Sequence, residues 1–213
     1  MPRLARLTYP GGFYHIFNRG LNKSPIFQEN NDYDKLLDTL TSLLDHGDWL
    51  IYTYCLMPNH YHFLIEEKKT PVSKLISRLF TSYSLYFNKK YHRHGPLFED
   101  RFKSRIIQKD PYFMLVSRYI HLNPYKSKQT NNPEDYPYSS LSEYTGKSFR
   151  KIINFSKVSL LLGEGENRLS DYLKFVKDGL NMNLDEYDPF TNDLEIIGNL
   201  TFSTHRKMKS YRT

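Results

Sequence analysis

The sequence predicts an α+β fold, a ferredoxin-like antiparallel sheet with helices on one face, followed by a mainly helical C-terminal extension. Two observations predict it. Strand-like and helix-like patterns alternate in the order β-α-β-β-α-β-α over residues 1–128, and a two-residue turn joins the two central strands, which makes them antiparallel. A chain of 213 residues can hold one such domain and an appendage. We predict a sheet domain over residues 1–140 and a helical extension over residues 141–213.

The first elements follow from alternation and helical spacing. Residues 12–18, GFYHIFN, alternate as a strand that ends at Arg19. The segment NDYDKLLDTLTSLLDHG repeats leucine at helical spacing, with Asn31 or Asp32 as the cap and Gly47 as the stop. A helix with one buried face is expected there.

The central hairpin is the clearest local signal. Two β-rich runs, WLIYTYCLM and HYHFLIEE, are separated only by Pro58 and Asn59, which favour a tight turn. Pro71 then begins a long helix whose apolar residues recur every three or four positions. These runs complete the first five elements of the domain.

The remaining elements are a strand, a helix and weaker helices. RFKSRIIQ alternates as a strand, and Asp110 begins the helix YFMLVSRYIHLN, which Pro124 is expected to end. NNPEDYPYSS reads as a loop. Beyond it, RLSDYLKFVKDGL and DLEIIGNLTFSTHRKMKS are expected to form helices.

Basic side chains concentrate in the middle of the chain. Residues 68–128 carry 14 Lys or Arg against 3 Asp or Glu, whereas the segments on either side are slightly acidic. Basic surface interleaved with Tyr and Phe is typical of proteins that bind nucleic acid, because cations meet phosphates and rings stack on unpaired bases. A solvated helix face is the alternative interpretation.

Cysteine content and hydropathy indicate the compartment. Cys55 has no second cysteine with which to form an internal disulfide, and it lies in an apolar run that favours a buried core residue. No stretch approaches 18 apolar residues, and the first twelve residues lack the apolar core of a signal peptide. We therefore expect a cytoplasmic protein in a reducing environment, without a membrane partner.

Two histidines share one face of a predicted strand. Because side chains alternate, His60 and His62 point one way, and Tyr61 points the other way toward the core. One divalent ion could accept a nitrogen from each imidazole, although histidine pairs on half-exposed strands are also common as ordinary surface residues. A metal site therefore needs a third ligand.

The last helix of the domain offers that ligand and a nucleophile. Tyr119 and Asn123 lie four residues apart, on one face of the helix. A phenol and a carboxamide oxygen beside two imidazoles suit phosphoryl transfer. Tyr119 also fits a packing tyrosine, and Asn123, which precedes Pro124, also fits a helix C-cap.

Five linked motifs resemble those of a known family. YHIFNRG, YCLMPNHYHFLI, HGPLFEDRFKS, SRYIHLNPYKS and DYPYSS occur in the order and at the approximate spacing of the REP-associated tyrosine transposases. These are single-tyrosine members of the HUH nuclease superfamily, with a transposase IS200-like domain. The resemblance covers residues 8–140. It implies the HUH endonuclease fold, a Tyr119 nucleophile, and Mg²⁺ or Mn²⁺ held by His60, His62 and Asn123.

The resemblance also implies a function. The family cleaves and rejoins single-stranded DNA beside hairpin repeats through a 5′-phosphotyrosine, and the other cleaved end is a free 3′-OH. Single-stranded DNA or DNA hairpins are the expected partners, and a domesticated, non-mobile hairpin-binding protein is the alternative. A binding module without chemistry would not need His60, His62, Tyr119 and Asn123 together. The expected phosphate contacts are Arg19, Arg78, Lys89, Lys90, Arg93, Arg101, Lys103 and Arg105, although Arg101 could instead pair with Glu99 or Asp100.

Other metal chemistry has less support. A zinc hydrolase could recruit His15, His92 or His94, but the sequence contains neither HExxH nor a cysteine pair. His121, two residues from Tyr119, points away from the site and is expected to be structural.

The C-terminal end bears on assembly. It carries an apolar stripe at Leu194, Ile197 and Leu200 and a basic end that suits a further DNA contact better than a dimer seam. That basic end consists of His205, Arg206, Lys207, Lys209 and Arg212. We predict a monomer whose tail adds hairpin affinity, and a dimer remains the alternative.

Overall fold

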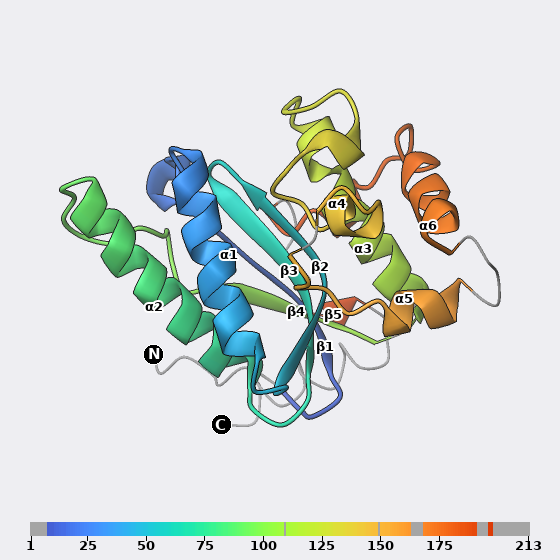
Figure 1. Cartoon of the computed structure of the whole chain (residues 1–213), viewed down its shortest axis with the longest axis horizontal. Helices are drawn as coiled ribbons and strands as arrows, with labels where there is room; N and C mark the ends of the chain where they lie inside the picture. Colours follow the sequence, from blue (N-terminus) through green and yellow to red (C-terminus); the bar gives the residue numbers. More distant parts are fainter. Residues whose placement is uncertain (1–7, 109, 149, 163–167, 191–195, 198–213) are drawn as a thin grey trace, which may run out of the picture.

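A twisted sheet forms the centre of the structure (Figure 1). The computed structural model describes residues 8–108, 110–148, 150–162, 168–190 and 196–197. Within them the strand order is β2-β3-β1-β4-β5, with β1 to β4 antiparallel and β5 parallel to β4. The strands are β1 (Phe13–Arg19), β2 (Trp49–Met57), β3 (His60–Glu67), β4 (Lys103–Ile107) and β5 (Ile196–Ile197). The predicted α+β fold with an antiparallel sheet is confirmed.

The helices follow the predicted order. The three long ones are α1 (Asn30–Leu44), α2 (Val72–Lys90) and α3 (Asp110–Lys126). Shorter helices are α4 (Leu141–Tyr144), α5 (Ser156–Leu161) and α6 (Arg168–Lys177), and 3₁₀ turns are η1 (Leu21–Lys23), η2 (Pro133–Asp135) and η3 (Asp185–Tyr187). The structure places the start of α1 at Asn30, where the Asp32 carboxylate accepts the backbone N–H groups of Gln28 and Glu29 at 2.8 and 3.2 Å.

The hairpin of β2 and β3 fixes which side chains share a face. Its turn is the predicted pair Pro58 and Asn59, so Met57 lies opposite His60. On the other side of β3, strand β1 sets Arg19 opposite His60 and Phe17 opposite His62. Because directly paired residues point to the same face, these side chains project together.

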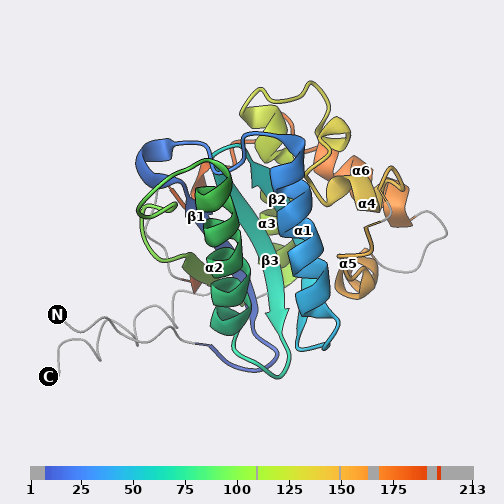
Figure 2. The same ribbon diagram turned by 60° about the vertical axis from the view of Figure 1, so that its left-hand side comes forward.

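Helices cover both faces of the sheet, whereas helices on one face were predicted. Helices α1 and α2 lie on one side and α3 on the other (Figures 1 and 2). On the first side Tyr61 stacks on Phe80 with ring centroids 4.0 Å apart, as expected for a core-facing ring. On the other side Thr53 of β2 bonds Ser117 of α3 at 2.7 Å. The physical reason is that β2 is apolar along nearly its whole length, and such a strand is buried on both faces.

Helix α3 continues past Pro124 to Lys126, so the prediction that Pro124 ends it is wrong. Pro124 has no N–H to give to the preceding turn, but the residues around it are buried, and packing outweighs the lost bond. The carbonyls of Asn123 and Pro124 accept from Ser127 and Gln129 at 2.9 and 2.8 Å. Asn123 is therefore inside the helix and not its cap.

The C-terminal extension packs onto the sheet domain. α6 confirms the helix predicted over RLSDYLKFVKDGL, but Ile196 and Ile197 pair with β4 as a strand where a helix was expected. Of the predicted apolar stripe, the structure describes Ile197 alone, which is buried. The rest of that predicted helix and its basic end lie outside the described residues. Tyr54 of β2 donates to Glu143 of α4 at 2.9 Å. We retain the boundary near residue 140 as a proposal.

A buried chain of hydrogen bonds ties α3 to the sheet and the extension. It runs through the side chains of Thr53, Ser117, Tyr172, His121 and Ser140 to the carbonyl of Tyr54. Its direction is fixed at Ser140, whose hydroxyl donates to the Tyr54 carbonyl at 3.1 Å and therefore accepts from His121 Nε2 at 2.7 Å. His121 Nδ1 then accepts from Tyr172 at 2.9 Å. As expected, His121 is structural.

This chain predicts acid sensitivity. Burial lowers the pKa of His121 to about 3 from an ordinary 6.5, so between these values the unfolded chain binds more protons. The stability that His121 contributes is complete above pH 6.5 and is lost as the pH falls. His121→Gln keeps one donor and one acceptor but cannot ionise. We expect it to reduce the slope of unfolding free energy against pH by about 1.4 kcal/mol per pH unit below 6.5.

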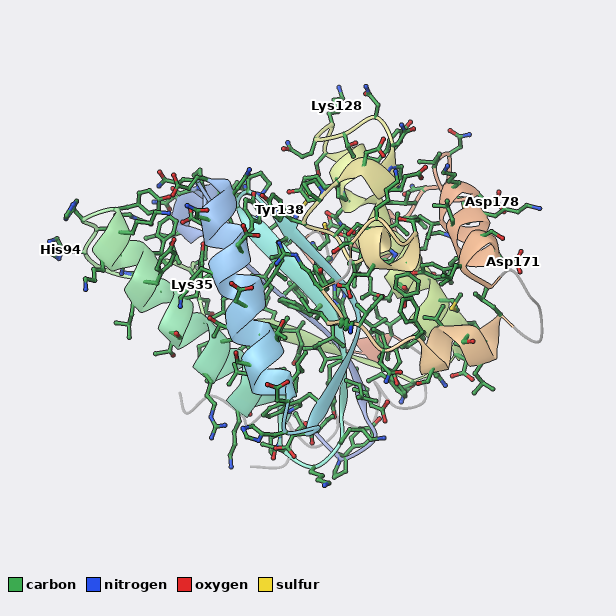
Figure 3. All side chains as sticks on the ribbon, in the orientation of Figure 1. Lys35, His94, Lys128, Tyr138, Asp171 and Asp178 are labelled. Carbon is green, nitrogen blue, oxygen red and sulfur yellow. The ribbon has the colours of Figure 1, made fainter. Side chains whose placement is uncertain are left out.

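Urea unfolding at pH 7.5, 6.0 and 5.0 checks this expectation. His94→Gln is the matched control, because His94 is exposed and projects from the end of α2 (Figure 3). Parallel pH profiles for wild type and His121→Gln would contradict it.

Candidate active site

Strand β3 and helix α3 bring the four predicted site residues together on the face of the sheet that α3 covers. The imidazoles of His60 and His62 on β3 have ring centroids 5.1 Å apart. From α3, the ring of Tyr119 meets that of His62 edge to face at 5.6 Å, and Asn123 Oδ1 lies 3.4 Å from His60 Nε2. The strand period of two and the helix period of four place each pair on one face.

The hydrogen bonds of His60 determine its tautomer. Asn59 Nδ2 donates to the Lys23 carbonyl at 3.1 Å, which turns Asn59 Oδ1 toward His60 Nδ1, 2.7 Å away. An amide oxygen only accepts, so His60 Nδ1 carries the hydrogen. His60 Nε2 therefore presents a lone pair to the site.

Asn123 presents a second lone pair. Its Nδ2 donates to the Tyr119 carbonyl at 3.3 Å, so its Oδ1 faces His60 Nε2. Both of these atoms are acceptors, and no hydrogen lies between them. Two acceptors 3.4 Å apart repel each other unless a cation lies beside them.

His62 contributes a third nitrogen. Its Nε2 is buried and has no hydrogen-bond partner among the described residues, while its Nδ1 lies 3.1 Å from His15 Nε2. Burial lowers the pKa of His60 to about 4 and, with the charges of neighbouring His60, His15 and Arg105, holds the pKa of His62 well below its ordinary value. Both imidazoles are neutral at pH 7, as ligation requires.

These atoms fit a divalent metal. Across the described residues, no group of three or more His, Cys, Asp or Glu could hold an ion. A metal at His60 and His62 would find the Asn123 oxygen beside it, 3.4 Å from His60 Nε2, and two nitrogens with a hard oxygen suit Mn²⁺ or Mg²⁺. Of the histidines that a zinc hydrolase could recruit, His94 lies beyond the end of α2, away from α3 (Figure 3), and His15 turns its Nε2 to His62 Nδ1 at 3.1 Å.

The Tyr119 phenol keeps its proton in this environment. Burial raises the pKa of Tyr119 above its ordinary value, and the negative charge of Asp188 and a hydrogen bond to it raise it further. A hydrogen bond with Asn123 and the charge of Arg105 act in the opposite direction. Attack by this oxygen therefore needs a nearby cation and a group that takes the proton.

The loop after α6 reaches into the site, and the sequence analysis did not assign it a role. The Phe190 ring lies 5.5 Å from that of His60 and 5.8 Å from that of His62, and the Arg19 guanidinium lies 4.9 Å from the same ring. Asp188 accepts the Phe190 N–H at 2.8 Å. No motif marked this loop, because an acidic residue and a ring in a turn carry no signal about the distant strand that they meet. Asn59 was also missed, although it adjoins His60.

Lys90 and Arg105, two of the predicted phosphate contacts, bind groups inside the protein. Lys90 bonds the buried carboxylate of Asp32 at 2.7 Å and also Glu29. Burial opposes the charge of Asp32, yet the bonds from Lys90 and its neighbours lower the Asp32 pKa. Arg105 is 1% exposed, and its guanidinium donates to backbone carbonyls of η3 and the residue after it at 3.4 and 3.5 Å. Lys90 and Arg105 are therefore not among the phosphate contacts that we propose.

The other basic candidates lie on both sides of the sheet. Exposed Arg78 and Lys89 belong to α2, which covers the face opposite the histidines, and Arg93 lies over the Phe87 ring at 5.5 Å. Exposed Lys103 is paired with Phe17 and so shares the face of His62.

Arg19 and Arg101 lie near the site end of β1. Arg19 forms a two-bond fork with Glu99 at 3.0 and 2.9 Å, so Glu99 pairs with Arg19 and not with Arg101. Asp100 accepts the backbone N–H of Arg101 at 2.8 Å, and the Arg101 residue is exposed. Arg19, Arg101 and Lys103 are the predicted phosphate contacts that remain on or beside β1 and β4, and we call them the site-face cations.

Comparison with known proteins identifies the family and the fold of the chain. The family model described as transposase IS200-like matches residues 9–123. A solved REP-associated tyrosine transposase bound to a REP hairpin is 16% identical, covers 69% of this chain and 87% of its own, and superposes with a TM-score of 0.56, which shows the same fold. A crystal structure of a proposed transposase from Deinococcus radiodurans R1 is 13% identical over 53% of this chain and 90% of its own, with a TM-score of 0.38.

No curated protein matches the sequence. In the part of the chain that the structure describes, no helix is both long and apolar enough to cross a bilayer. The family model spans more than half of the 213 residues and includes His60, His62, Tyr119 and Asn123. The chain belongs to the family of IS200-like transposases.

Proposed function

We propose that this chain is a metal-dependent single-stranded DNA transposase and endonuclease, which cleaves and rejoins DNA at hairpin elements through a 5′-phosphotyrosine. One observation carries the proposal: the imidazoles of His60 and His62 and the Asn123 carboxamide lie together beside the buried phenol of Tyr119. Membership of the transposase family and a fold shared with a hairpin-bound transposase support it.

In the proposed reaction, the Tyr119 oxygen attacks the scissile phosphorus. A bond forms between that oxygen and phosphorus, the bond from phosphorus to the 3′ oxygen breaks, and the leaving oxygen takes up a proton as a 3′-OH. Mg²⁺ or Mn²⁺ held by His60, His62 and Asn123 would supply positive charge to the phosphate. Because the phosphotyrosine keeps the energy of the phosphodiester, another 3′-OH can attack it and rejoin DNA without ATP.

Asp188 is proposed to take the phenolic proton. It is hydrogen-bonded to Tyr119, and a carboxylate within this reach can act as a general base. We expect Asp188→Asn to slow formation of the covalent adduct by about 100-fold or more, because an amide cannot accept the proton. Hairpin affinity and Mn²⁺ affinity should change little. Single-turnover kinetics with a hairpin oligonucleotide measure the rate, and an unchanged or faster rate would contradict this role.

DNA affinity is expected to depend on salt through the site-face cations. Lys103→Ala should reduce the slope of log K against log salt by about 0.7, the effect of one lost phosphate contact on a single strand. The matched control is Arg78→Ala, an exposed cation on α2, across the sheet from the histidines. Fluorescence anisotropy between 50 and 300 mM salt gives the slopes. An equal or larger change in Arg78→Ala would assign the DNA track to the α2 face.

The proposed function is tested with a pool of labelled single-stranded oligonucleotides that form hairpins, with randomised flanks, and Mn²⁺. We expect a DNA–protein adduct that survives denaturing electrophoresis, together with a shorter strand ending in a 3′-OH. EDTA added before the DNA should prevent the formation of both products. Binding of the pool without any covalent adduct or cleavage would overturn the enzymatic proposal.

A further inference from the structure

A buried histidine next to the site is paired with His62. His15 on β1 is fully buried, and its Nε2 lies 3.1 Å from His62 Nδ1, with the two rings 5.2 Å apart. Its own Nδ1 has no hydrogen-bond partner among the described residues. Because His15 is fully buried it cannot meet DNA, and any effect it has on the site passes through His62.

One hydrogen bond links the two rings, and its direction decides what His62 offers. If His15 donates, then His62 Nδ1 accepts and the only hydrogen on neutral His62 is on Nε2, where it blocks a metal. If His62 donates through Nδ1, its Nε2 carries a lone pair. A neutral imidazole has one nitrogen that donates and one that accepts, so His15 Nε2 can take either part in this bond. Both directions are therefore chemically available.

We propose that His15 is a positioning residue: it accepts the Nδ1–H of His62 and thereby holds the His62 Nε2 lone pair toward the metal. Asn59 does the same for His60 through its amide oxygen. The two ligands would then have separate orienting acceptors, one from the β2–β3 turn and one from β1. Such outer partners commonly set ligand orientation and metal affinity. This inference rests on the proposed metal site.

A histidine at position 15 allows either direction of this hydrogen bond, because its Nε2 can donate or accept. In the metal-free protein either direction leaves one ring N–H unpaired, at His62 Nε2 or at His15 Nδ1. Metal at His62 Nε2 is compatible with only one of the two, so binding selects that tautomer. Where His15 is the donor before metal binds, metal binding moves the shared hydrogen from His15 Nε2 to His62 Nδ1. The hydrogen on His62 Nε2 is released to solvent and one from solvent is taken up on His15 Nδ1, so both rings stay neutral.

The test measures Mn²⁺ affinity of DNA-free protein by electron paramagnetic resonance titration. His15→Leu removes the acceptor and is expected to weaken Mn²⁺ binding by about 10- to 100-fold. His15→Gln places an amide oxygen near the position of the ring nitrogen and should retain affinity within about threefold. His94→Gln, at an exposed position in the turn after α2, is the control and should match wild type. A folded His15→Leu protein with wild-type affinity would overturn the proposal.

A second measurement does not depend on a variant that folds. In wild-type protein with ¹⁵N-labelled histidine, saturating Mg²⁺ should give His62 a protonated Nδ1 and an unprotonated Nε2. A hydrogen on His62 Nε2 in the Mg²⁺-bound protein would also overturn the proposal. Since neither measurement uses DNA, a failure to form the Tyr119 adduct would count against the proposed function and not against the role of His15.

Discussion

His62→Ala is expected to abolish DNA cleavage while hairpin binding stays close to wild type. The variant removes His62 Nε2, which has no hydrogen-bond partner among the described residues. Loss of a residue that only orients a ligand weakens metal binding by up to about 100-fold, so loss of a ligand itself should weaken Mn²⁺ binding by more than about 100-fold. Hairpin affinity rests instead on the site-face cations and on stacking. His60→Ala should behave in the same way. Parallel gel-shift and cleavage assays on one hairpin measure the two properties.

Asn123→Ala is the graded comparison. Water can replace an amide oxygen on a hard ion more readily than it replaces an imidazole, so the loss of cleavage should be smaller. His94→Gln should leave both properties unchanged. If His62→Ala loses binding and cleavage to the same extent, the histidines stabilise the sheet and the metal assignment is wrong.

Tyr119→Phe is expected to reduce covalent adduct to background. The substitution removes only the hydroxyl oxygen that we propose as the nucleophile, so the edge-to-face contact with His62 can be kept. Hairpin affinity and Mn²⁺ affinity should therefore remain within about threefold, since no charge is lost. Tyr112→Phe, in the first turns of the same helix and only partly buried, is the matched control and should form adduct normally. Adduct in Tyr119→Phe would place the nucleophile elsewhere.

Local patterns predicted most of the fold. Two β-rich runs and the turn at Pro58 and Asn59 predicted the bounds of β2 and β3. Alternation of side chains along β3 put Tyr61 in the core and His60 and His62 on the opposite face. The end of α3 was mispredicted because the rule that proline stops a helix considers backbone chemistry alone. Burial of the residues around Pro124 outweighs it.

The immediate surroundings of the site were beyond pattern reasoning. His15, Asn59 and Asp188 reach the site from a neighbouring strand, a turn and a loop after α6, and only the sheet register and the packing of the extension bring them together. A similar reason explains why Lys90 and Arg105 were predicted to contact phosphate although they bind groups inside the protein. The charge of a segment shows how many cations it has, but not which of them already bind carboxylates or carbonyls inside the protein.

The most direct test of the account is to identify the amino acid that is joined to DNA. Wild-type protein is incubated with the hairpin pool and Mn²⁺, the adduct is isolated under denaturing conditions, and nuclease and protease digestion is followed by tandem mass spectrometry. We expect a 5′-linked nucleotide on the hydroxyl oxygen of Tyr119. A nucleotide attached to a different residue, or cleaved DNA without any covalently modified peptide, would contradict it.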